Sequence, residues 1–300
     1  MERPAVIVAL ALSPSLDVTY EVDRLELGGI TRPRTVTRVA GGKALNLARA
    51  ARQLGAHVSA VAALGGPTGA WIADLLESDG VPTTVVGLAS TTRSCFAIAE
   101  EHGAGSSTDV YEPATPLSED EWEAFARGAA EVARRAEPGA WVALSGSLPS
   151  GAGPDDVAGL LAKLRSMGCR IAVDGSGAGL RATAPHADLL KINRAEAADV
   201  LGEEFADAAS AARALHERWG VDAVVTDGVR GGFALLRAAE FTVAPPASPG
   251  RFSAGSGDAF LGGLLTGLDR GDSPADALDL ARSAAERNAA CPGQGVLAPL

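Results

Sequence analysis

Residues 251–268 read RFSAGSGDAFLGGLLTGL, with two glycines around a serine, then an aspartate and an apolar run. Such a stretch is typical of a helix start, where unpaired backbone amides and the positive end of the helix dipole attract anions. Asp258 follows the second glycine directly, so its carboxylate would lie beside those amides. The stretch has two interpretations: an ordinary helix start with Asp258 in its first turn, or an anion site with a neighbouring base.

Elsewhere the chain alternates apolar runs with amphipathic segments. The runs are short and continuously apolar, which predicts strands covered on both faces, as in a parallel sheet. The segments between them are rich in alanine and have the spacing of amphipathic helices. Predicted strands span 5–12, 58–64, 140–146, 169–175, 187–193 and 221–228, predicted helices 43–54, 119–135, 154–167 and 208–219, and a hairpin 233–246. This order predicts an α/β fold with a doubly wound sheet.

Two segments break the alternation. Residues 16–39 and 93–111 are richer in β-branched residues, with polar alternation and glycine turns. That pattern predicts short antiparallel strands, and two insertions of one kind predict a small β lid on the α/β core. Because no linker or repeat is evident, residues 1–300 are expected to form a single domain.

The composition narrows the classes of partner. The chain has 26 Lys and Arg against 37 Asp and Glu, a net charge of -11, so we expect no nucleic-acid partner. A phosphate ligand would need a local cluster of positive charge. Three distant cysteines form neither a metal-binding spacing nor a disulfide framework, which favours a reducing cytoplasm. The apolar run 5–12 is too short to span a bilayer, so no membrane partner is expected.

Polar residues recur where the predicted strands end. Asp17 follows the first strand, and Ser145, Asp174, Asn193 and Thr226 stand at the ends of later ones. Ligands of open α/β sheets bind beyond the carboxyl ends of the strands. The repetition therefore predicts a ligand site along that edge of the sheet.

The segment AGGKALNLAR, 40–49, places Gly42, Lys43 and Asn46 at the start of a predicted helix. Glycine permits close approach of a ligand, lysine supplies a positive charge, and the asparagine amide both donates and accepts hydrogen bonds. The Walker spacing GxxxxGK[ST] occurs nowhere in the chain. A glycine-rich helix entry with a solvated lysine is the alternative.

Other segments also have both a structural and a functional interpretation. Asn193 and Glu196 have the spacing of a capping box, but the same carboxylate would suit Mg²⁺. Residues 226–232, TDGVRGG, form a glycine turn that suits an ordinary connection or a nucleotide contact. Residues 145–151, SGSLPSG, lack the G-x-S-x-G elbow and are interpreted as a binding loop. Arg93, which begins the second lid segment, is either solvated or suited to a phosphate.

Taken in order, these pieces resemble the ribokinase-like PfkB family of carbohydrate kinases. They are most similar to its sugar-phosphate branch of 1-phosphofructokinases, tagatose-6-phosphate kinases and minor 6-phosphofructokinases. The resemblance implies a three-layer α/β/α fold with a mostly parallel central sheet and a small β lid. The matching segments are SPSLDVTY (13–20), GGKALNLAR (41–49), TTRSCFAI (91–98), VALSGSLPSG (142–151), VDGSG (173–177), KINRAE (191–196), TDGVRGG (226–232) and AGSGDAF (254–260).

The resemblance implies a mechanism for the quoted stretch. Asp258 would take the proton from the attacking sugar hydroxyl, and the amides of Gly255, Ser256 and Gly257 would form the anion hole for the transferring phosphoryl group. We expect the helix dipole to keep the Asp258 carboxylate ionised, which would make it a weak base.

The resemblance also implies binding roles. On the substrate side, Asp17, Gly42 and Asn46 would bind sugar hydroxyls, with Ser145 assigned to the same side, and Lys43 and Arg93 would bind an existing phosphate. On the nucleotide side, Asn193, Glu196 and Lys191 match the element associated with Mg²⁺ and the ATP phosphates, with Glu196 as the metal ligand. Asp174 is assigned to the nucleotide side, and Thr226, Gly228 and Gly231 match the loop around ATP.

Three residues depart from the family pattern. Ala44 replaces a glycine and is expected to crowd the sugar pocket with its β-carbon. Ile192 replaces a proline, and Asp227 adds a negative charge to the nucleotide loop. These departures affect which substrate is expected more than which reaction is expected.

The expected reaction is ATP- and Mg²⁺-dependent phosphorylation of a ketohexose phosphate, with fructose 1-phosphate converted to fructose 1,6-bisphosphate as the first choice. The alternatives are a tagatose-6-phosphate kinase or 6-phosphofructokinase, a kinase for an unphosphorylated sugar or nucleoside, and a non-catalytic sugar-phosphate sensor. The resemblance further implies a homodimer formed through the lid.

Overall fold

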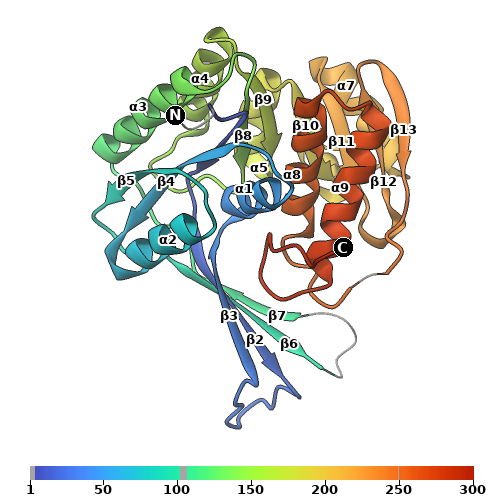
Figure 1. The fold of residues 1–300 in the computed structure, drawn as a ribbon. Helices are drawn as coiled ribbons and strands as arrows, with labels where there is room; N and C mark the ends of the chain where they lie inside the picture. Colours follow the sequence, from blue (N-terminus) through green and yellow to red (C-terminus); the bar gives the residue numbers. More distant parts are fainter. Residues whose placement is uncertain (1–3, 102–106, 249) are drawn as a thin grey trace.

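The computed structural model describes residues 4–101, 107–248 and 250–300. Helices and strands follow one another along most of this length (Figure 1). The strands are β1 (Ile7–Ala11), β2 (Ser15–Val22), β3 (Thr35–Gly41), β4 (Val58–Gly65), β5 (Thr83–Leu88), β6 (Ser94–Glu100), β7 (Ser107–Tyr111), β8 (Trp141–Ser145), β9 (Arg170–Asp174), β10 (Leu189–Asn193), β11 (Asp222–Thr226), β12 (Gly232–Leu236) and β13 (Ala239–Val243). The helices are α1 (Lys43–Gln53), α2 (Gly66–Ser78), α3 (Glu119–Arg135), α4 (Pro154–Ser166), α5 (Gly177–Thr183), α6 (Arg194–Leu201), α7 (Ala208–Trp219), α8 (Ser256–Arg270) and α9 (Pro274–Ala289).

The described residues form one large sheet in the order β13-β12-β11-β10-β9-β8-β1-β4-β5. Strands β11 to β5 in this order pair in parallel, while β12 and β13 add an antiparallel hairpin at one end. The five residues of β1 are all buried, as expected for a central strand covered on both faces. The carboxyl ends of the parallel strands meet along one edge.

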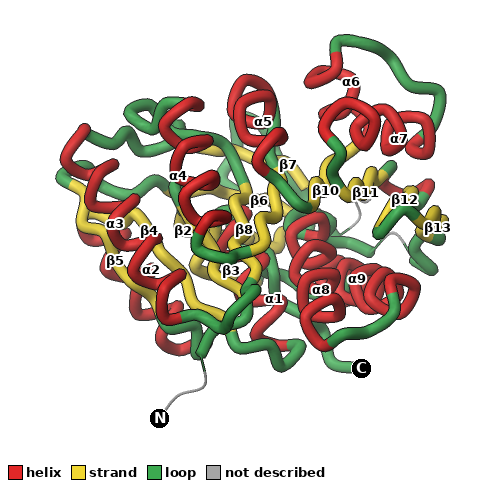
Figure 2. The backbone as a smooth tube through the Cα atoms, turned by 90° about the horizontal axis from the view of Figure 1, so that it is seen from above, coloured by secondary structure: helices red, strands yellow, loops and turns green. Residues whose placement is uncertain are grey.

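Helices cover both faces of this sheet (Figure 2). One hydrophobic core joins it to α3, α4, α5, α6 and α7, for example through Phe125 and Leu161. The second core joins it to α1, α2, α8 and α9, through residues such as Leu45, Ile72 and Leu261. The architecture is therefore the three-layer α/β/α arrangement that the resemblance implies.

The lid is a separate four-stranded sheet in the order β3-β2-β6-β7. It projects from the body, and its strands come from the two predicted insertions (Figure 1). Residues 102–106 of the second insertion lie outside the described residues. The pairs β2–β3 and β6–β7 are antiparallel, as predicted, but β2 and β6 are parallel because the two hairpins enter the sheet side by side.

The predicted strands and helices all correspond to observed elements. Helices α3 and α7 have the predicted bounds. Strand β5 was not predicted, because it alternates exposed and buried residues at the sheet edge and lacks a continuous apolar run. Within the described residues, no helix combines the length and apolar character needed to cross a membrane.

Candidate active site

Helix α8 begins at the carboxyl-end edge of the sheet. Gly255 is its N-cap, with φ of +81°, a backbone conformation that favours glycine. Across the described residues, no hydrogen bond uses the amides of Gly255 and Gly257, whereas the Ser256 amide donates to the Ser253 carbonyl at 3.1 Å. Two of the three predicted anion-hole amides are therefore free to bind an oxyanion.

Asp258 lies in the first turn of α8, where it is 6% exposed. The side-chain amide of Asn46, in the first turns of α1, donates to Asp258 Oδ2 at 2.9 Å. Helices α1 and α8 pack against each other on the same face of the sheet, which brings these two residues together although 212 positions separate them. The predicted substrate ligand Asn46 is therefore also a direct partner of the predicted base.

The protonation of Asp258 differs from the expectation. Burial, assisted by the nearby negative charge of Asp174, raises the pKa of Asp258 to about 7. The Lys43 and Lys191 ammonium groups and the Asn46 hydrogen bond oppose this rise without cancelling it. The expectation of an ionised, weakly basic carboxylate is wrong, because burial raises the pKa of Asp258. A pKa near 7 suits a general base.

Two lysines enclose Asp174 beside the base. Lys191 Nζ lies 2.8 Å from Asp174 Oδ2, and Lys43 Nζ lies 2.9 Å from Asp174 Oδ1. Burial alone would raise the pKa of Asp174, but the two ammonium groups outweigh it and hold this pKa below its usual range. A β-carbon on Gly257 would come within 2.9 Å of Lys191 Nζ, so this ammonium group lies against the predicted anion hole.

Asp17 lies in β2 at the base of the lid, 3% exposed. Ser15 Oγ donates to Asp17 Oδ1 at 2.5 Å, and the Gly42 amide is 3.4 Å from Oδ2. Burial raises the pKa of Asp17 to about 6, although both hydrogen bonds lower it. A β-carbon on Gly41 would overlap the Asp17 carboxyl group, so the first glycine of GGK is needed for this approach.

Three buried polar atoms at this edge have no partner in the described residues. They are Ser13 Oγ, Asn46 Oδ1 and Ser145 Oγ. Ser145 ends β8, next to β1, and Ser13 follows β1 closely. Because buried polar groups are usually paired, three free atoms suit a ligand with several hydroxyl groups. Ser13 had not been predicted as a site residue.

Arg93 lies next to Ser13 and acts on the nearby Asp17 carboxylate. Its guanidinium donates to the carbonyls of Ser13 at 3.1 Å, Pro14 at 3.4 Å and Glu112 at 3.0 Å. Lys43, which was assigned to the same phosphate, instead points toward Asp174 and lies 3.8 Å from Glu196 Oε1. The two cations therefore have different partners, because Arg93 acts on Asp17, whereas Lys43 acts on Asp174, Glu196 and Asp258.

Asn193 and Glu196 form the predicted capping box at the start of α6. Asn193 Oδ1 accepts from the Glu196 amide at 2.9 Å, and Glu196 Oε2 accepts from the Asn193 amide at 2.8 Å. The second Glu196 oxygen faces Lys43. Among the described residues, no three His, Cys, Asp or Glu side chains gather into a metal cage. A single hard carboxylate fits Mg²⁺ that is held mainly by phosphates and water.

A cavity of about 290 Å³ adjoins the start of α8 on the other side. Thr226, Gly228 and Gly231 line it, as predicted for the ATP loop. A β-carbon on Gly231 would overlap the Val243 carbonyl, so this turn requires glycine. The remaining wall is largely apolar, and sequence reasoning missed it because no motif marks it; it includes Val229, Val243, Pro246, Phe260, Ala285 and Ala289.

The three departures from the family pattern are compatible with this site. Ala44 is 2% exposed and belongs to the hydrophobic core, and its crowding of the sugar pocket stays a prediction. Ile192 is buried in β10, and Asn193 still caps α6. Asp227 is paired with Arg230 at 2.7 Å and Arg194 at 3.3 Å, which compensates its charge.

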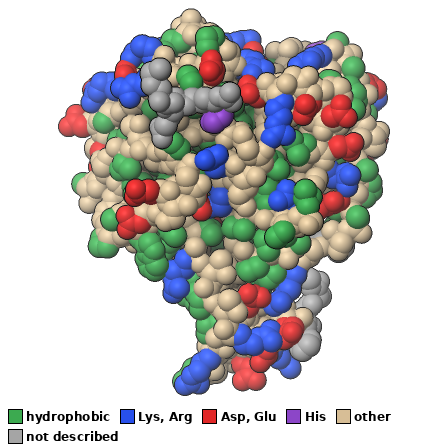
Figure 3. All heavy atoms as spheres, in the orientation of Figure 1, with side chains coloured by type: hydrophobic (Ala, Val, Ile, Leu, Met, Phe, Trp, Pro, Cys, Tyr) green, Lys and Arg blue, Asp and Glu red, His purple; other side chains and the backbone are tan. Residues whose placement is uncertain are grey.

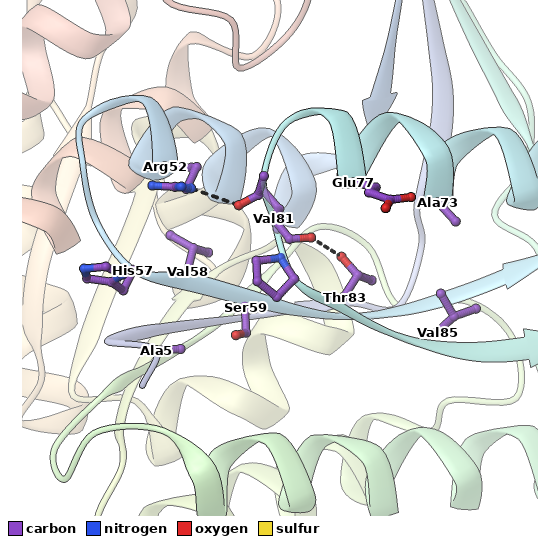
Figure 4. Close-up of a pocket in the computed structure, with 12 residues that line it drawn as sticks. Ala5, Arg52, His57, Val58, Ser59, Ala73, Glu77, Val81, Thr83 and Val85 are labelled. Atoms are coloured by element: carbon purple, nitrogen blue, oxygen red, sulfur yellow. Dashed lines mark hydrogen bonds between the residues drawn. The ribbon is translucent and has the colours of Figure 1, made fainter. Parts of the chain in front are cut away.

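A larger groove of about 740 Å³ lies near the opposite, amino ends of β4 and β5. Arg52, His57 and Glu77 are among the side chains around it (Figure 4). None of the predicted site residues lines this groove. The side chains suited to phosphoryl transfer therefore gather at the carboxyl ends of the strands, as expected for an open α/β sheet.

Comparison with known proteins agrees with this geometry. The sequence model described as pfkB family carbohydrate kinase matches residues 8–299. The structure is similar to phosphofructokinase-2 from Escherichia coli in complex with potassium, with a TM-score of 0.87 and 26% identity over 98% of this chain and 96% of that one. The same enzyme in complex with fructose-6-phosphate gives a TM-score of 0.85 and 26% identity, over 95% and 94%.

A possible 1-phosphofructokinase from Thermotoga maritima has a TM-score of 0.81 at 20% identity, covering 94% of this chain and 90% of that one, which shows a shared fold. The family match extends over nearly the whole chain and includes every element that contributes to the site. The chain therefore belongs to the pfkB family of carbohydrate kinases and is an ATP-dependent sugar kinase.

Proposed function

We propose that this kinase phosphorylates a ketohexose phosphate, with fructose 1-phosphate as the first choice and fructose 1,6-bisphosphate as the product. The observation that supports the proposal is the placement of Arg93 near Asp17 and against the carbonyl of Ser13, whose hydroxyl is one of the three unpartnered polar atoms, because it combines a guanidinium with groups that bind hydroxyls. Guanidinium groups suit phosphate, and the acidic chain needs such a local positive charge.

In this proposal Asp258 takes the proton from the attacking sugar hydroxyl as the phosphoryl group arrives. The free amides of Gly255 and Gly257, with Lys191 beside them, stabilise the negative charge of the transferring group. Lys43 lies between the Asp174 and Glu196 carboxylates and adds positive charge near the base. Positioning and electrostatic stabilisation supply most of the catalysis in such a reaction.

The nucleotide is assigned to the 290 Å³ cavity. Its apolar wall suits the base of ATP, and its contact with Ser256 and Gly257 would place the phosphates at the start of α8. Asn193 and Glu196 would hold Mg²⁺ directly or through water, and the ion would neutralise phosphate charge. Asp174 fixes the two lysines that face this region.

The test is an ADP-release assay with fructose 1-phosphate, fructose 6-phosphate, tagatose 6-phosphate, fructose, ribose and adenosine. We expect turnover with a fructose phosphate, and Arg93→Ala should raise its KM at least about tenfold while leaving the KM for ATP unchanged. Arg38→Ala is the matched control, because Arg38 lies in the lid over Trp71. Equal turnover of fructose by the Arg93→Ala variant and the unaltered enzyme, without turnover of any sugar phosphate, would identify a kinase for unphosphorylated sugars.

Fructose 6-phosphate is a second candidate substrate. The similar structures at 26% identity are of phosphofructokinase-2, including the complex with fructose-6-phosphate, whereas the possible 1-phosphofructokinase is 20% identical. Both fructose phosphates would give the same bisphosphate, so the ratio of their kcat/KM values decides between them. If no compound is turned over while several raise the melting temperature, the protein is a sensor.

We also propose a homodimer formed through the lid of a single kinase domain. Tyr20, Phe96, Ile98 and Val110 share one face of the lid and are not fully buried within the protomer, and the Tyr20 and Phe96 rings stack with centroids 6.2 Å apart. The lid stands clear of the body in the space-filling view (Figure 3), so a second copy is the occupant proposed for this apolar face.

The three free cysteines favour a reducing cytoplasm as the compartment in which the kinase acts.

A further inference from the structure

The C-terminal tail, residues 291–300, crosses the start of α8. A β-carbon on Gly255 would lie 2.9 Å from Cβ and 3.0 Å from Cα of Gln294. A β-carbon on the next residue of the tail, Gly295, would overlap the backbone of Asn46. The tail therefore touches both helix starts that supply the base and its amide partner, and only glycine permits this contact.

Gln294 shares the Asn46 amide with Asp258. Asn46 Nδ2 donates to Asp258 Oδ2 at 2.9 Å and to Gln294 Oε1 at 3.2 Å. A side-chain amide nitrogen carries two hydrogens, so each acceptor takes one, and Oδ1 remains the free acceptor. Because Asn46 is 1% exposed, water is poorly placed to replace an acceptor that is lost.

The tail is held from two sides, so the position of Gln294 is well defined. Arg49 donates to the Gln294 carbonyl at 2.8 Å from α1. Asn288, fully buried in α9, accepts from the Gly295 amide at 2.7 Å and donates to Ser256 Oγ at 3.1 Å. One buried amide thus joins the tail to the predicted anion hole.

We propose that Gln294 is a positioning residue for phosphoryl transfer. By accepting one hydrogen of the Asn46 amide, it holds that amide in the orientation that donates to Asp258 and keeps Asn46 Oδ1 as the free acceptor. The inference rests on the proposed function, in which Asp258 takes the proton of the sugar hydroxyl. Gln294 acts through Asn46 and does not itself take a proton.

The proposal predicts a change in the titration of Asp258. The charged groups that act on Asp258 are Lys43 from α1, Asp174 from β9 and Lys191 from β10, and none of them belongs to the tail. A hydrogen bond to the carboxylate stabilises its charged form. Loosening the Asn46 amide therefore raises the pKa of Asp258, while the three charges remain in place.

The experiment follows the Asp258 carboxyl carbon by NMR in full-length protein labelled at aspartate Cγ, without substrate. The signal is assigned by its loss in Asp258→Asn. Gln294→Met, which keeps the length and removes the acceptor, should raise the titration midpoint by about one pH unit. An unchanged midpoint in the folded variant overturns the proposal.

Gln53 offers a matched control. Gln53 Nε2 donates to the Gly295 carbonyl at 2.9 Å and its Oε1 accepts from the Leu297 amide at 3.0 Å, so it holds the tail through backbone groups. Gln53→Met should lower the melting temperature and leave the Asp258 midpoint in place. An equal shift in both variants would assign the effect to tail packing and overturn the proposal.

Kinetics give a second measurement on the same proteins. Gln294→Met should lower kcat about tenfold on the alkaline plateau with the KM for ATP unchanged, and Gln294→Glu, which keeps an acceptor oxygen, should restore that plateau. If Gln294→Met unfolds, Gln294→Asn replaces it, because the shorter side chain withdraws the oxygen. Unfolding of both would show a structural role and overturn the proposal. If the unaltered enzyme turns over no sugar phosphate, the proposed function fails, and the NMR titration still decides the role of Gln294.

Discussion

Asp258, in the first turn of α8, and Asp17, in β2, are both buried, at 6% and 3% exposed. Burial raises the pKa of Asp258 to about 7 and that of Asp17 to about 6. We predict that kcat/KM falls tenfold per pH unit below about pH 7 and more steeply below about pH 6, because the base must be ionised to accept a proton. Measuring kcat/KM from pH 5 to 8.5 tests this, and a flat profile down to pH 5.5 would contradict it.

Gly41 makes room for Asp17 at the proposed sugar end of the site. Its missing side chain leaves room for the Asp17 carboxyl group, which a β-carbon would overlap. We predict that Gly41→Ala raises the KM for the sugar at least about tenfold, with little change in the KM for ATP. Gly87→Ala is the control, since a β-carbon there meets nothing within 4 Å. Equal KM values in the two variants would remove Asp17 from the sugar site.

At the scale of the element, helices α3 and α6 begin with the same capping motif. Ser118 and Glu121 form a capping box in α3, and Asn193 and Glu196 form one in α6. Ser118→Ala and Asn193→Ala should each cost about 1 kcal/mol of the free energy of unfolding. Only Asn193→Ala should also weaken ATP or Mg²⁺ affinity, because only that box faces the site. If the two variants retain equal activity, the capping box in α6 has a structural role alone.

The elements themselves follow from local sequence patterns. Alanine-rich spacing predicts the bounds of α3 and α7, and continuous apolar runs predict β1, β4 and β8 through β11. These patterns act within one turn or one strand, where periodicity is informative. The edge strand β5 and the parallel pairing of β2 with β6 depend on neighbours distant in sequence, so local pattern leaves them open.

The site was predictable where a short sequence motif determines the local backbone geometry. The glycines and Asp258 at the start of α8 are one example, and the capping box of α6 is another. The pKa of Asp258 was mispredicted because it depends on burial beneath other elements. The contact of Gln294 with Asn46 joins residues 248 positions apart, and the orientation of Ala44 depends on how α1 packs, so neither follows from spacing.

At the scale of the whole molecule, the lid determines the proposed oligomeric state, because its apolar face is proposed to contact a second copy. We predict that Phe96→Glu gives a monomer in sedimentation equilibrium, since a carboxylate on that face would be desolvated in the dimer. Val85→Glu is the control, because Val85 is 48% exposed on β5, away from the lid. An unchanged mass of the Phe96→Glu protein, or dissociation by both variants, would place the interface elsewhere.

The charge balance is a second property of the whole molecule. The net charge of -11 opposes anionic ligands, and the cation proposed to offset it is Arg93, because Lys43 and Lys191 are balanced by the Asp174 and Glu196 carboxylates. The proposed phosphoryl transfer therefore relies on local cations, free amides and one buried base, and the substitution of Asp258 removes the base alone.

The most direct test is turnover by Asp258→Asn with ATP and the best fructose phosphate, together with its melting temperature. We predict a loss of about 10²- to 10⁴-fold in kcat, as for removal of a general base. Folding raises the pKa of this carboxyl group from 3.8 to about 7, so the group stabilises the fold below about pH 4 and this contribution is lost as the pH rises toward 7. The Asp258→Asn variant should therefore have a higher melting temperature than the unaltered protein at pH 8. Turnover within about twofold of the unaltered enzyme, in a folded variant, would contradict the assignment of Asp258 as the base.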